Sequence, residues 1–357
     1  MFSGDRAGGP AIDSLSPPPG LRERWAALAQ AGANIFCTPE WAETWWRHFG
    51  RGGEPAISLA RDGAGRELAV LALYRRRRGG LRLLRFIGHG VGDELGPVCD
   101  PADLGSALCC LRDQAAGADV LLAERLPAGA HDHSPLGAVL LRAESSPVID
   151  LQAEGGWEGW LAARSAHFRQ HVRRRARWLA RELGLRYRLS ADPRALQRDL
   201  ETLFSLHGAR WGGRSSAFAG ARERFHREFA ELALQRGWLR LWLAESDGRA
   251  VAAWYGFRFA GVESSYQFGR DTSLDRYGVG VAMLEHSIRE AAGDGMREYR
   301  LLRGDEQYKE RYATRDPQVH TLALPASALG RSALAAVRQL AVRPRGRELL
   351  KRALGGG

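Results

Sequence analysis

The residues that decide the fold are 269–292, which read GRDTSLDRYGVGVAMLEHSIREAA. A polar loop in this stretch leads through Gly278-Val279-Gly280 directly into an amphipathic helix, predicted over Val279 to Ala292. Glycines there let backbone N–H groups approach an anion, and the unpaired first-turn donors and positive end of the helix complete a phosphate site. A plain loop that needs glycine for its backbone angles explains these residues equally well. The neighbouring elements must decide between the two interpretations.

A meander of three strands is predicted immediately before this stretch. The strands are Trp238 to Glu245, Ala250 to Phe259 and Val262 to Phe268, with short turns between them. A further strand, Glu298 to Leu302, follows the helix. This order of elements predicts an α+β fold with a mixed sheet.

The first half of the chain has its own alternation of elements. Helices are predicted over Leu21 to Gln30, Thr38 to Phe49 and Leu104 to Ala116, and strands over Glu67 to Tyr74, Leu81 to Ile87 and Asp119 to Glu124. The tryptophans of the second helix are expected to be core. Because 357 residues suffice for two cores, we expect a disordered tail at 1–20, domains at 21–150 and 151–325, and a C-terminal helical tail at 326–357.

The composition indicates an anionic partner. The formal charge is +11, almost all of it from arginine, whose planar fork suits phosphate and carboxylate.

The four cysteines have no spacing suited to disulfides or zinc, no metal is expected, and no signal peptide or long apolar run is present. A cytoplasmic protein without stable membrane insertion is expected. Motifs of serine hydrolases, P-loop NTPases and zincins are absent, and the glycines at 88–92 do not lead into a helix, which excludes a dinucleotide loop.

The order of elements and the glycine turn resemble the GNAT superfamily of acyltransferases. In that superfamily the acyl-CoA pyrophosphate lies at an Arg-x-x-Gly-x-Gly/Ala turn, whose two glycines would be Gly278 and Gly280. Asp275 holds the place of the motif's arginine, and Arg276 follows one position later. The resemblance thus implies a donor site built chiefly from backbone N–H groups, with Arg276 as a helper.

The resemblance is closer to BioF-like acetyltransferases, which are related to FemAB peptidyltransferases and CelD-type proteins. It covers about Phe36 to Leu324 and implies tandem GNAT-like domains, each with a mixed, largely antiparallel sheet flanked by helices. The matching segments are Phe36 to Trp41 with Trp45-Trp46, Arg169 to Arg177, Leu206-His207 with Arg210-Trp211, Tyr266 with Gly269, Tyr277 to Gly280, and Arg303 to Lys309.

The same resemblance implies site residues. Asp305 or Glu306 would accept the proton of an attacking amine, Tyr308 would donate a proton to the thiolate, and Lys309 would stabilise the oxyanion. The donor site would comprise Phe268, Gly269, Arg276, Gly278, Val279 and Gly280. The acceptor site would comprise Arg173, Arg177, Arg210, Trp211 and Tyr266.

The favoured function is N-acyl transfer from acetyl-CoA or another acyl-CoA to an amine. The acceptor would be an anionic small molecule or sugar, such as an amino sugar or a cell-envelope or exopolysaccharide precursor. Two alternatives stay open at this point. One replaces the donor by aminoacyl-tRNA, as in FemAB peptidyltransferases, and the other is a non-catalytic accessory or nucleic-acid-binding protein of polysaccharide synthesis.

Overall fold

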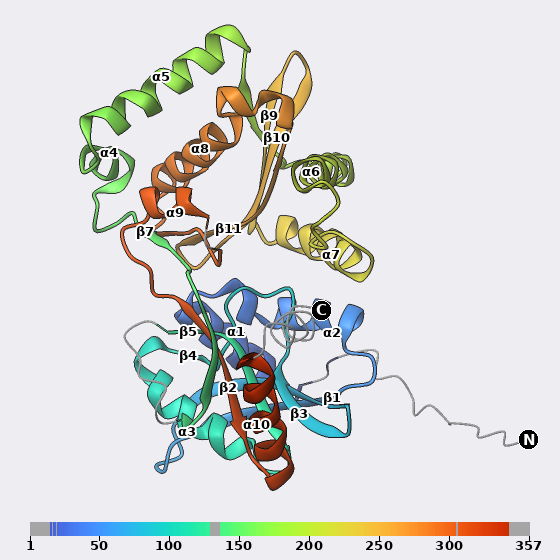
Figure 1. Cartoon of the computed structure of the whole chain (residues 1–357). Coiled ribbons are helices and arrows are strands. Elements are labelled where there is room, and N and C mark those ends of the chain that lie inside the picture. Colours follow the sequence, from blue (N-terminus) through green and yellow to red (C-terminus); the bar gives the residue numbers. More distant parts are fainter. Residues whose placement is uncertain (1–14, 16, 19, 129–135, 305, 343–357) are drawn as a thin grey trace, which may run out of the picture.

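The computed structural model describes residues 15, 17–18, 20–128, 136–304 and 306–342, and it has two layered halves, one above the other in Figure 1. Each half is built on one mixed sheet with helices packed on it, so the predicted α+β fold is confirmed. The first sheet has the strand order β1-β2-β3-β5-β13-β6, with β4 paired to β2. Its strands are β1 (Glu54–Arg61), β2 (Glu67–Arg78), β3 (Leu81–Phe86), β4 (Val98–Cys99), β5 (Val120–Pro127), β6 (Val139–Glu144) and β13 (Val319–Pro325).

Helices cover both faces of the first sheet. Along β5, alternate side chains face opposite sides, so that Leu121 joins the main core while Leu122 joins a small cluster with Leu334. The main-core side carries α1 (Leu21–Gly32), α2 (Pro39–Phe49) and α3 (Leu104–Gln114), and the other side carries α10 (Ala328–Val342).

The second sheet has the order β7-β12-β11-β10-β9-β8. In Figure 1, α6 and α7 lie on one side of it and α4, α5 and α8 on the other. The strands are β7 (Val148–Asp150), β8 (Arg186–Leu189), β9 (Leu239–Ser246), β10 (Arg249–Phe259), β11 (Val262–Arg270) and β12 (Glu298–Arg300). The helices are α4 (Gly156–Ala162), α5 (Ala166–Glu182), α6 (Leu196–Trp211), α7 (Ala221–Gln235), α8 (Val279–Gly293) and α9 (Gln307–Tyr312).

The two sheets share a strand plan. Each contains a three-strand antiparallel meander, β1-β2-β3 or β9-β10-β11, whose last strand pairs in parallel with the next strand, β5 or β12. In both cases a helix, α3 or α8, connects the parallel pair. This repetition supports a tandem arrangement of two similar units.

The chain crosses between the halves at positions that differ from the expected domain limits. β7 begins before residue 150 and pairs with β12 of the second sheet, whereas β13 returns to the first sheet and inserts between β5 and β6. β13 lies there because its side chains Leu322 and Ala323 are buried in that half. Most of the expected tail at 1–20, and residues 343–357 of the C-terminal tail, lie outside the described residues.

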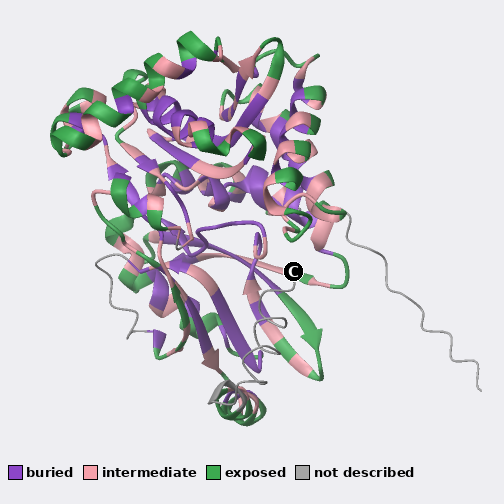
Figure 2. Cartoon of the chain, turned by 45° about the horizontal axis from the view of Figure 1, so that its top comes forward, coloured by how far each residue is buried: buried purple, intermediate pink, exposed green. Residues whose placement is uncertain are grey.

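One aromatic core joins the halves, as the purple ribbon at their junction in Figure 2 illustrates. Trp41 of α2 is fully buried and packs edge-on against Phe225 and Phe229 of α7, with ring centroids 4.9 and 4.6 Å apart. The expectation that the tryptophans of α2 are core is therefore confirmed.

The feature of the second sheet that matters most for the site is the early separation of β11 and β12. They pair only over Val262–Ser264 and Glu298–Arg300. Beyond this point Leu302 adopts a left-handed backbone conformation, with φ 55°, which turns the chain away from β11. Among the described residues, no strand continues the ladder on this side of β11.

Gly269 permits the close packing of α6 on β11. A Cβ atom at this position would lie 2.2 Å from the backbone nitrogen of His207. We expect Gly269→Ala to lower the free energy of unfolding in urea by about 1–3 kcal/mol, because α6 must shift outward. Gly293→Ala, at a helical glycine with free space around it, is the control and should cost nothing. Equal stability of both variants would contradict this packing.

His226 gives stability a pH dependence. It is fully buried among aromatic rings, and burial lowers its pKa to about 3 from the ordinary 6.5. Between these values the unfolded chain binds the extra proton, so stability rises with pH across this window and falls on acidification. His226→Gln should reduce the slope by up to about 1.4 kcal/mol per pH unit, measured by urea unfolding between pH 4 and 6. The exposed His167→Gln should leave the slope unchanged.

Candidate active site

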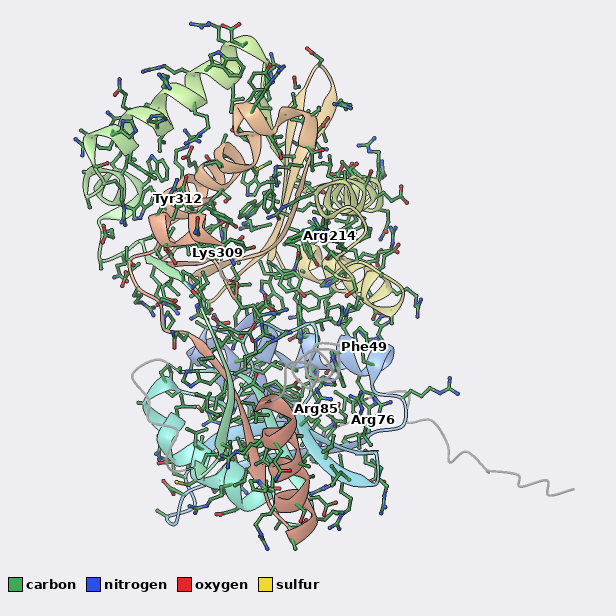
Figure 3. The ribbon with its side chains drawn as sticks, viewed as in Figure 1. Phe49, Arg76, Arg85, Arg214, Lys309 and Tyr312 are labelled. Carbon is green, nitrogen blue, oxygen red and sulfur yellow. The ribbon has the colours of Figure 1, made fainter. Side chains whose placement is uncertain are left out.

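A cavity of about 880 Å³ lies between the two halves, where β11 and β12 have separated. The first half contributes Trp45, Arg85 and Glu124 to its lining, and the second contributes Tyr266 and Phe268. Figure 3 shows Phe49, Arg76 and Arg85 on the lower half and Lys309 on the upper half, and all four line this space. We refer to it as the central cavity.

A second cavity of about 250 Å³ lies against the Gly278-Val279-Gly280 turn. Its remaining lining is largely apolar and includes Val281 and Leu284 of α8. We refer to it as the turn cavity. Four residues line both cavities, so the two spaces meet: Arg210, Trp254, Phe268 and Tyr308. This junction is the place where groups bound in the two cavities could react.

The glycine turn has the geometry predicted for an anion site. Gly278 is the N-cap of α8 in the left-handed conformation, with φ 73°, and no side chain caps the helix. The first N–H groups of α8 therefore remain open to a ligand. A Cβ atom on Gly280 would lie 3.1 Å from the Phe268 ring, so glycine also lets α8 approach β11 closely.

Phe268 is held from the side of α6. Its carbonyl oxygen accepts a hydrogen bond from Nδ1 of His207 at 3.1 Å and a longer one from Arg210 at 3.4 Å. The Arg210 guanidinium lies 3.7 Å from the centre of the Phe268 ring. Phe268 thus has a fixed position at the junction, while Gly269 behind it packs on α6. Their place in the donor site stays a prediction.

Arg276, the expected helper at the turn, faces away from the turn cavity. Its guanidinium lies over the Tyr277 ring at 4.5 Å, and it lines a groove on the other side of Gly278. Asp275 forms an ion pair with Arg270 at the turn. The carboxylate in the place of the motif's arginine is therefore neutralised by a residue of β11.

The segment after β12 wraps around Lys309. The Lys309 ammonium is buried, donates to the carbonyl oxygens of Leu302 at 3.2 Å and Arg303 at 2.9 Å, and forms an ion pair with Glu306 at 2.9 Å. Its three N–H donors thus have partners within the loop. Lys309 thus holds the chain as it leaves β12, and it also lines the central cavity; its contact with the oxyanion stays a prediction. Asp305 lies outside the described residues.

Tyr308 reaches the junction from α9. Burial, and secondarily the nearby Glu306, raises the pKa of its phenol above the usual value, while Arg210 opposes the shift. The hydroxyl is therefore protonated at neutral pH. The residue lines both cavities where they meet, and its role as a proton donor stays a prediction.

The loop at 88–94 joins the first half to the site. The Tyr266 hydroxyl donates to the carbonyl of Val91 at 2.7 Å, and Arg303 pairs with Asp93 at 2.6 Å. Arg300 pairs with Glu94 at 2.8 Å. The sequence excluded this loop as a dinucleotide motif but did not indicate that it contacts Tyr266, Arg300 and Arg303. These partners lie about two hundred residues away in the chain, so no local pattern connects them to the loop.

The lining of the central cavity is strongly positive. Its four carboxylates, Asp93, Glu124, Glu144 and Glu306, all have cationic partners. Five arginines of the lining have no carboxylate within 4 Å among the described residues: Arg76, Arg77, Arg78, Arg210 and Arg222. Arg210 and Arg222 are partly buried, and burial lowers their pKa values, yet a guanidinium remains a cation at neutral pH.

The predicted acceptor residues divide into two groups. Arg210, Trp211 and Tyr266 line the central cavity. Arg173 and Arg177 lie on the exposed side of α5 and line neither the central cavity, nor the turn cavity, nor the groove beside Gly278. Among the described residues there is no group of three metal-ligating side chains, and no helix is long and apolar enough to cross a membrane.

Comparisons with known proteins agree with this geometry. The family model described as an acetyltransferase (GNAT) domain matches residues 166–310. The structure of FemX superposes with a TM-score of 0.61 at 12% identity, covering 87% of this chain and 97% of FemX. The structure of L-PGS from Bacillus licheniformis superposes with a TM-score of 0.51 at 12% identity, covering 92% of this chain and 98% of L-PGS. A conserved protein of unknown function from Bacteroides thetaiotaomicron superposes with a TM-score of 0.53 at 13% identity, covering 84% of this chain and 92% of that protein. No curated protein matches in sequence.

Residues 166–310 match the acetyltransferase (GNAT) domain model, and this match indicates an acyltransferase. The likeness to FemX extends over both halves and shows the shared fold. The predicted resemblance to the GNAT superfamily is therefore confirmed for residues 166–310, and FemX shares the fold.

Lys309→Met tests the structural role of the ammonium. We expect the free energy of unfolding to fall by about 2–3 kcal/mol, because two carbonyls and Glu306 lose their cation in a buried place. The exposed Arg311→Met, on the same helix, removes a charge without these contacts and should be neutral. Unchanged stability of Lys309→Met would show that the loop does not depend on this residue.

Proposed function

We propose that the protein is an N-acyltransferase that moves an acyl group, acetyl by default, from acyl-CoA in the turn cavity to an amine in the central cavity. The observation that carries the proposal is the junction of the two cavities at Arg210, Trp254, Phe268 and Tyr308. A donor and an acceptor that enter from opposite sides would meet there, which is the geometric requirement for direct transfer.

The donor would be held by the glycine turn and its apolar neighbours. Open N–H groups at the start of α8 suit the pyrophosphate, and Val279, Val281 and Leu284 suit the apolar arm that leads to the thioester. The thioester carbon would then lie beside Phe268 and Tyr308.

The transfer step needs a neutral amine, a stabilised oxyanion and a proton for the thiolate. The amine nitrogen would form a bond to the thioester carbon, and the carbon–sulfur bond would break as the tetrahedral intermediate collapses. Tyr308, which lies at the junction of the two cavities, would give its proton to the departing sulfur. Glu306, which lines the central cavity, would accept the proton from the amine, and Asp305 is the second candidate for this role.

The charge of the central cavity supports an anionic acceptor. Its arginines without carboxylate partners would bind phosphate or carboxylate groups, and Arg210 and Arg222 would do so near the junction. An amino sugar or a cell-envelope or exopolysaccharide precursor with an anionic group fits this charge. Polysaccharide synthesis as the biological setting rests on the sequence resemblance.

A second candidate function uses aminoacyl-tRNA as the donor. The exposed face of α5 favours it, because Arg173, Arg177 and Arg181 present positive charge that a longer polyanion would contact. Transfer of an amino acid from charged tRNA, lost at high salt, would support this alternative.

Calorimetric binding of acetyl-CoA and longer acyl-CoA tests the leading proposal. Wild-type protein should bind at least one of them, and Gly278→Glu should abolish binding, because the new carboxylate lies at the phosphate position. Gly248→Glu is the matched control, since Gly248 has φ 74° and lies in the β9–β10 turn with free space around it. Absence of binding to any acyl-CoA by the wild type would overturn the proposal.

A further inference from the structure

We propose that Ser215 and His207 form a nucleophilic pair in the central cavity that accepts an acyl group from an activated ester or thioester onto the Ser215 oxygen. The Ser215 hydroxyl lies 2.9 Å from Nε2 of His207, and Ser215 lines the central cavity. The proposed direct transfer from acyl-CoA to an amine uses neither side chain. The inference therefore adds a second chemistry, in which the protein itself carries the acyl group for part of the reaction.

The end of α6 brings the two side chains together. Gly212 and Gly213 follow the helix in left-handed backbone conformations, with φ 54° and 73°, and they reverse the direction of the chain. Ser215 thereby returns to His207, eight residues earlier. The Ala217 N–H donates to the Ser215 oxygen at 3.2 Å and holds it in place. The pair thus has a defined geometry, although the sequence lacks the GxSxG motif of serine hydrolases.

The surroundings of His207 leave its Nε2 free to accept a proton. A carbonyl oxygen can only accept, so the contact of Nδ1 with the Phe268 carbonyl at 3.1 Å places the ring hydrogen on Nδ1. Burial lowers the pKa of His207, against the Phe268 carbonyl, which raises it, so the ring is neutral at pH 7. A neutral imidazole with an acceptor at its far nitrogen is the arrangement in which histidine activates a serine.

Packing keeps the imidazole in this orientation. His207 is 3% exposed, and its ring lies edge-on to the Phe218 ring with centroids 4.9 Å apart. The helix backbone at His207 packs on Gly269 of β11. The ring therefore connects the junction, at the Phe268 carbonyl, with the Ser215 hydroxyl.

Two arginines place positive charge beside the pair. Arg210 follows His207 by three residues on α6, and the Arg222 guanidinium donates to the hydroxyl of Ser216, the neighbour of Ser215, at 2.6 Å. Both arginines line the central cavity, and neither has a carboxylate within 4 Å in the part of the chain that the structure describes. Such charges stabilise the negative oxygen that forms when a serine attacks an acyl carbon.

The chemical steps need only water or an amine as a further reactant. The Ser215 oxygen forms a bond to the acyl carbon while its proton passes to Nε2 of His207. The bond from the acyl carbon to the leaving oxygen or sulfur then breaks, and the leaving group takes that proton. Water or an amine next attacks the serine ester and gives a proton to His207. The bond between the Ser215 oxygen and the acyl carbon breaks, and Ser215 regains its proton.

Covalent labelling of the whole chain at pH 7 tests the inference. A fluorophosphonate probe should label Ser215, and p-nitrophenyl acetate should leave an acetyl group on the same residue, both located by peptide mass spectrometry. Ser215→Ala should lose both modifications and lower kcat/KM for p-nitrophenyl acetate by about a hundredfold, because the nucleophile is gone. Ser216→Ala is the matched control, since its hydroxyl contacts Arg222, and it should keep the label and the rate.

His207→Gln distinguishes an activated serine from one that is merely accessible. Glutamine cannot take the serine proton, so labelling of Ser215 should slow by about a hundredfold in a variant that urea unfolding shows to be folded. Labelling at an equal rate in wild type and in folded His207→Gln would overturn the inference. So would an unlabelled Ser215, or equal ester hydrolysis by Ser215→Ala and Ser216→Ala.

The outcomes separate this inference from the proposed function. Wild-type protein that binds acyl-CoA but leaves Ser215 unlabelled would overturn the inference and leave the proposed function standing. Labelled Ser215 in a protein that binds no acyl-CoA would overturn the proposed function alone. The p-nitrophenyl ester and the fluorophosphonate carry no coenzyme A, so neither readout depends on the turn cavity.

Discussion

The candidate active site depends on one feature of the second sheet, the early separation of strands β11 and β12. They pair over three residues, and the left-handed conformation of Leu302 then carries the chain away, held by the carbonyl contacts of Lys309. Space opens on both sides of Phe268 as a result. The central cavity, the turn cavity and their junction are all consequences of this separation.

The first half contributes part of the lining of the central cavity, and many of the side chains that it contributes are charged. Its loop at 88–94 fixes Tyr266 and Arg303 through Val91 and Asp93. At the position that corresponds to the glycine turn, α3 is preceded by Asp100 and Asp103, and Asp103 pairs with Arg66. The Asp100 side chain accepts a hydrogen bond from the Ala102 N–H there, so a carboxylate of the protein occupies this helix start.

Local patterns made much of the fold predictable. The meander, the helix after Gly278 and the buried tryptophans of α2 follow from alternation, turn residues and apolar spacing. The crossing of β7 and β13 between the sheets was not predictable, because pairing between segments about 150–200 residues apart leaves no local signal. The ion pair of Asp93 with Arg303 was missed for the same reason. Lys309 was predicted from the resemblance to stabilise the oxyanion, and its buried contacts with Leu302, Arg303 and Glu306 could not be predicted from the sequence.

The central claim is that donor and acceptor meet at Phe268 and Tyr308. The most direct measurement is a crystal structure of the protein with coenzyme A bound. The account predicts the thiol sulfur at the junction beside Phe268 and Tyr308, with the pyrophosphate over Gly278 to Gly280. Coenzyme A bound elsewhere, or with its sulfur directed into solvent away from the central cavity, would contradict the account.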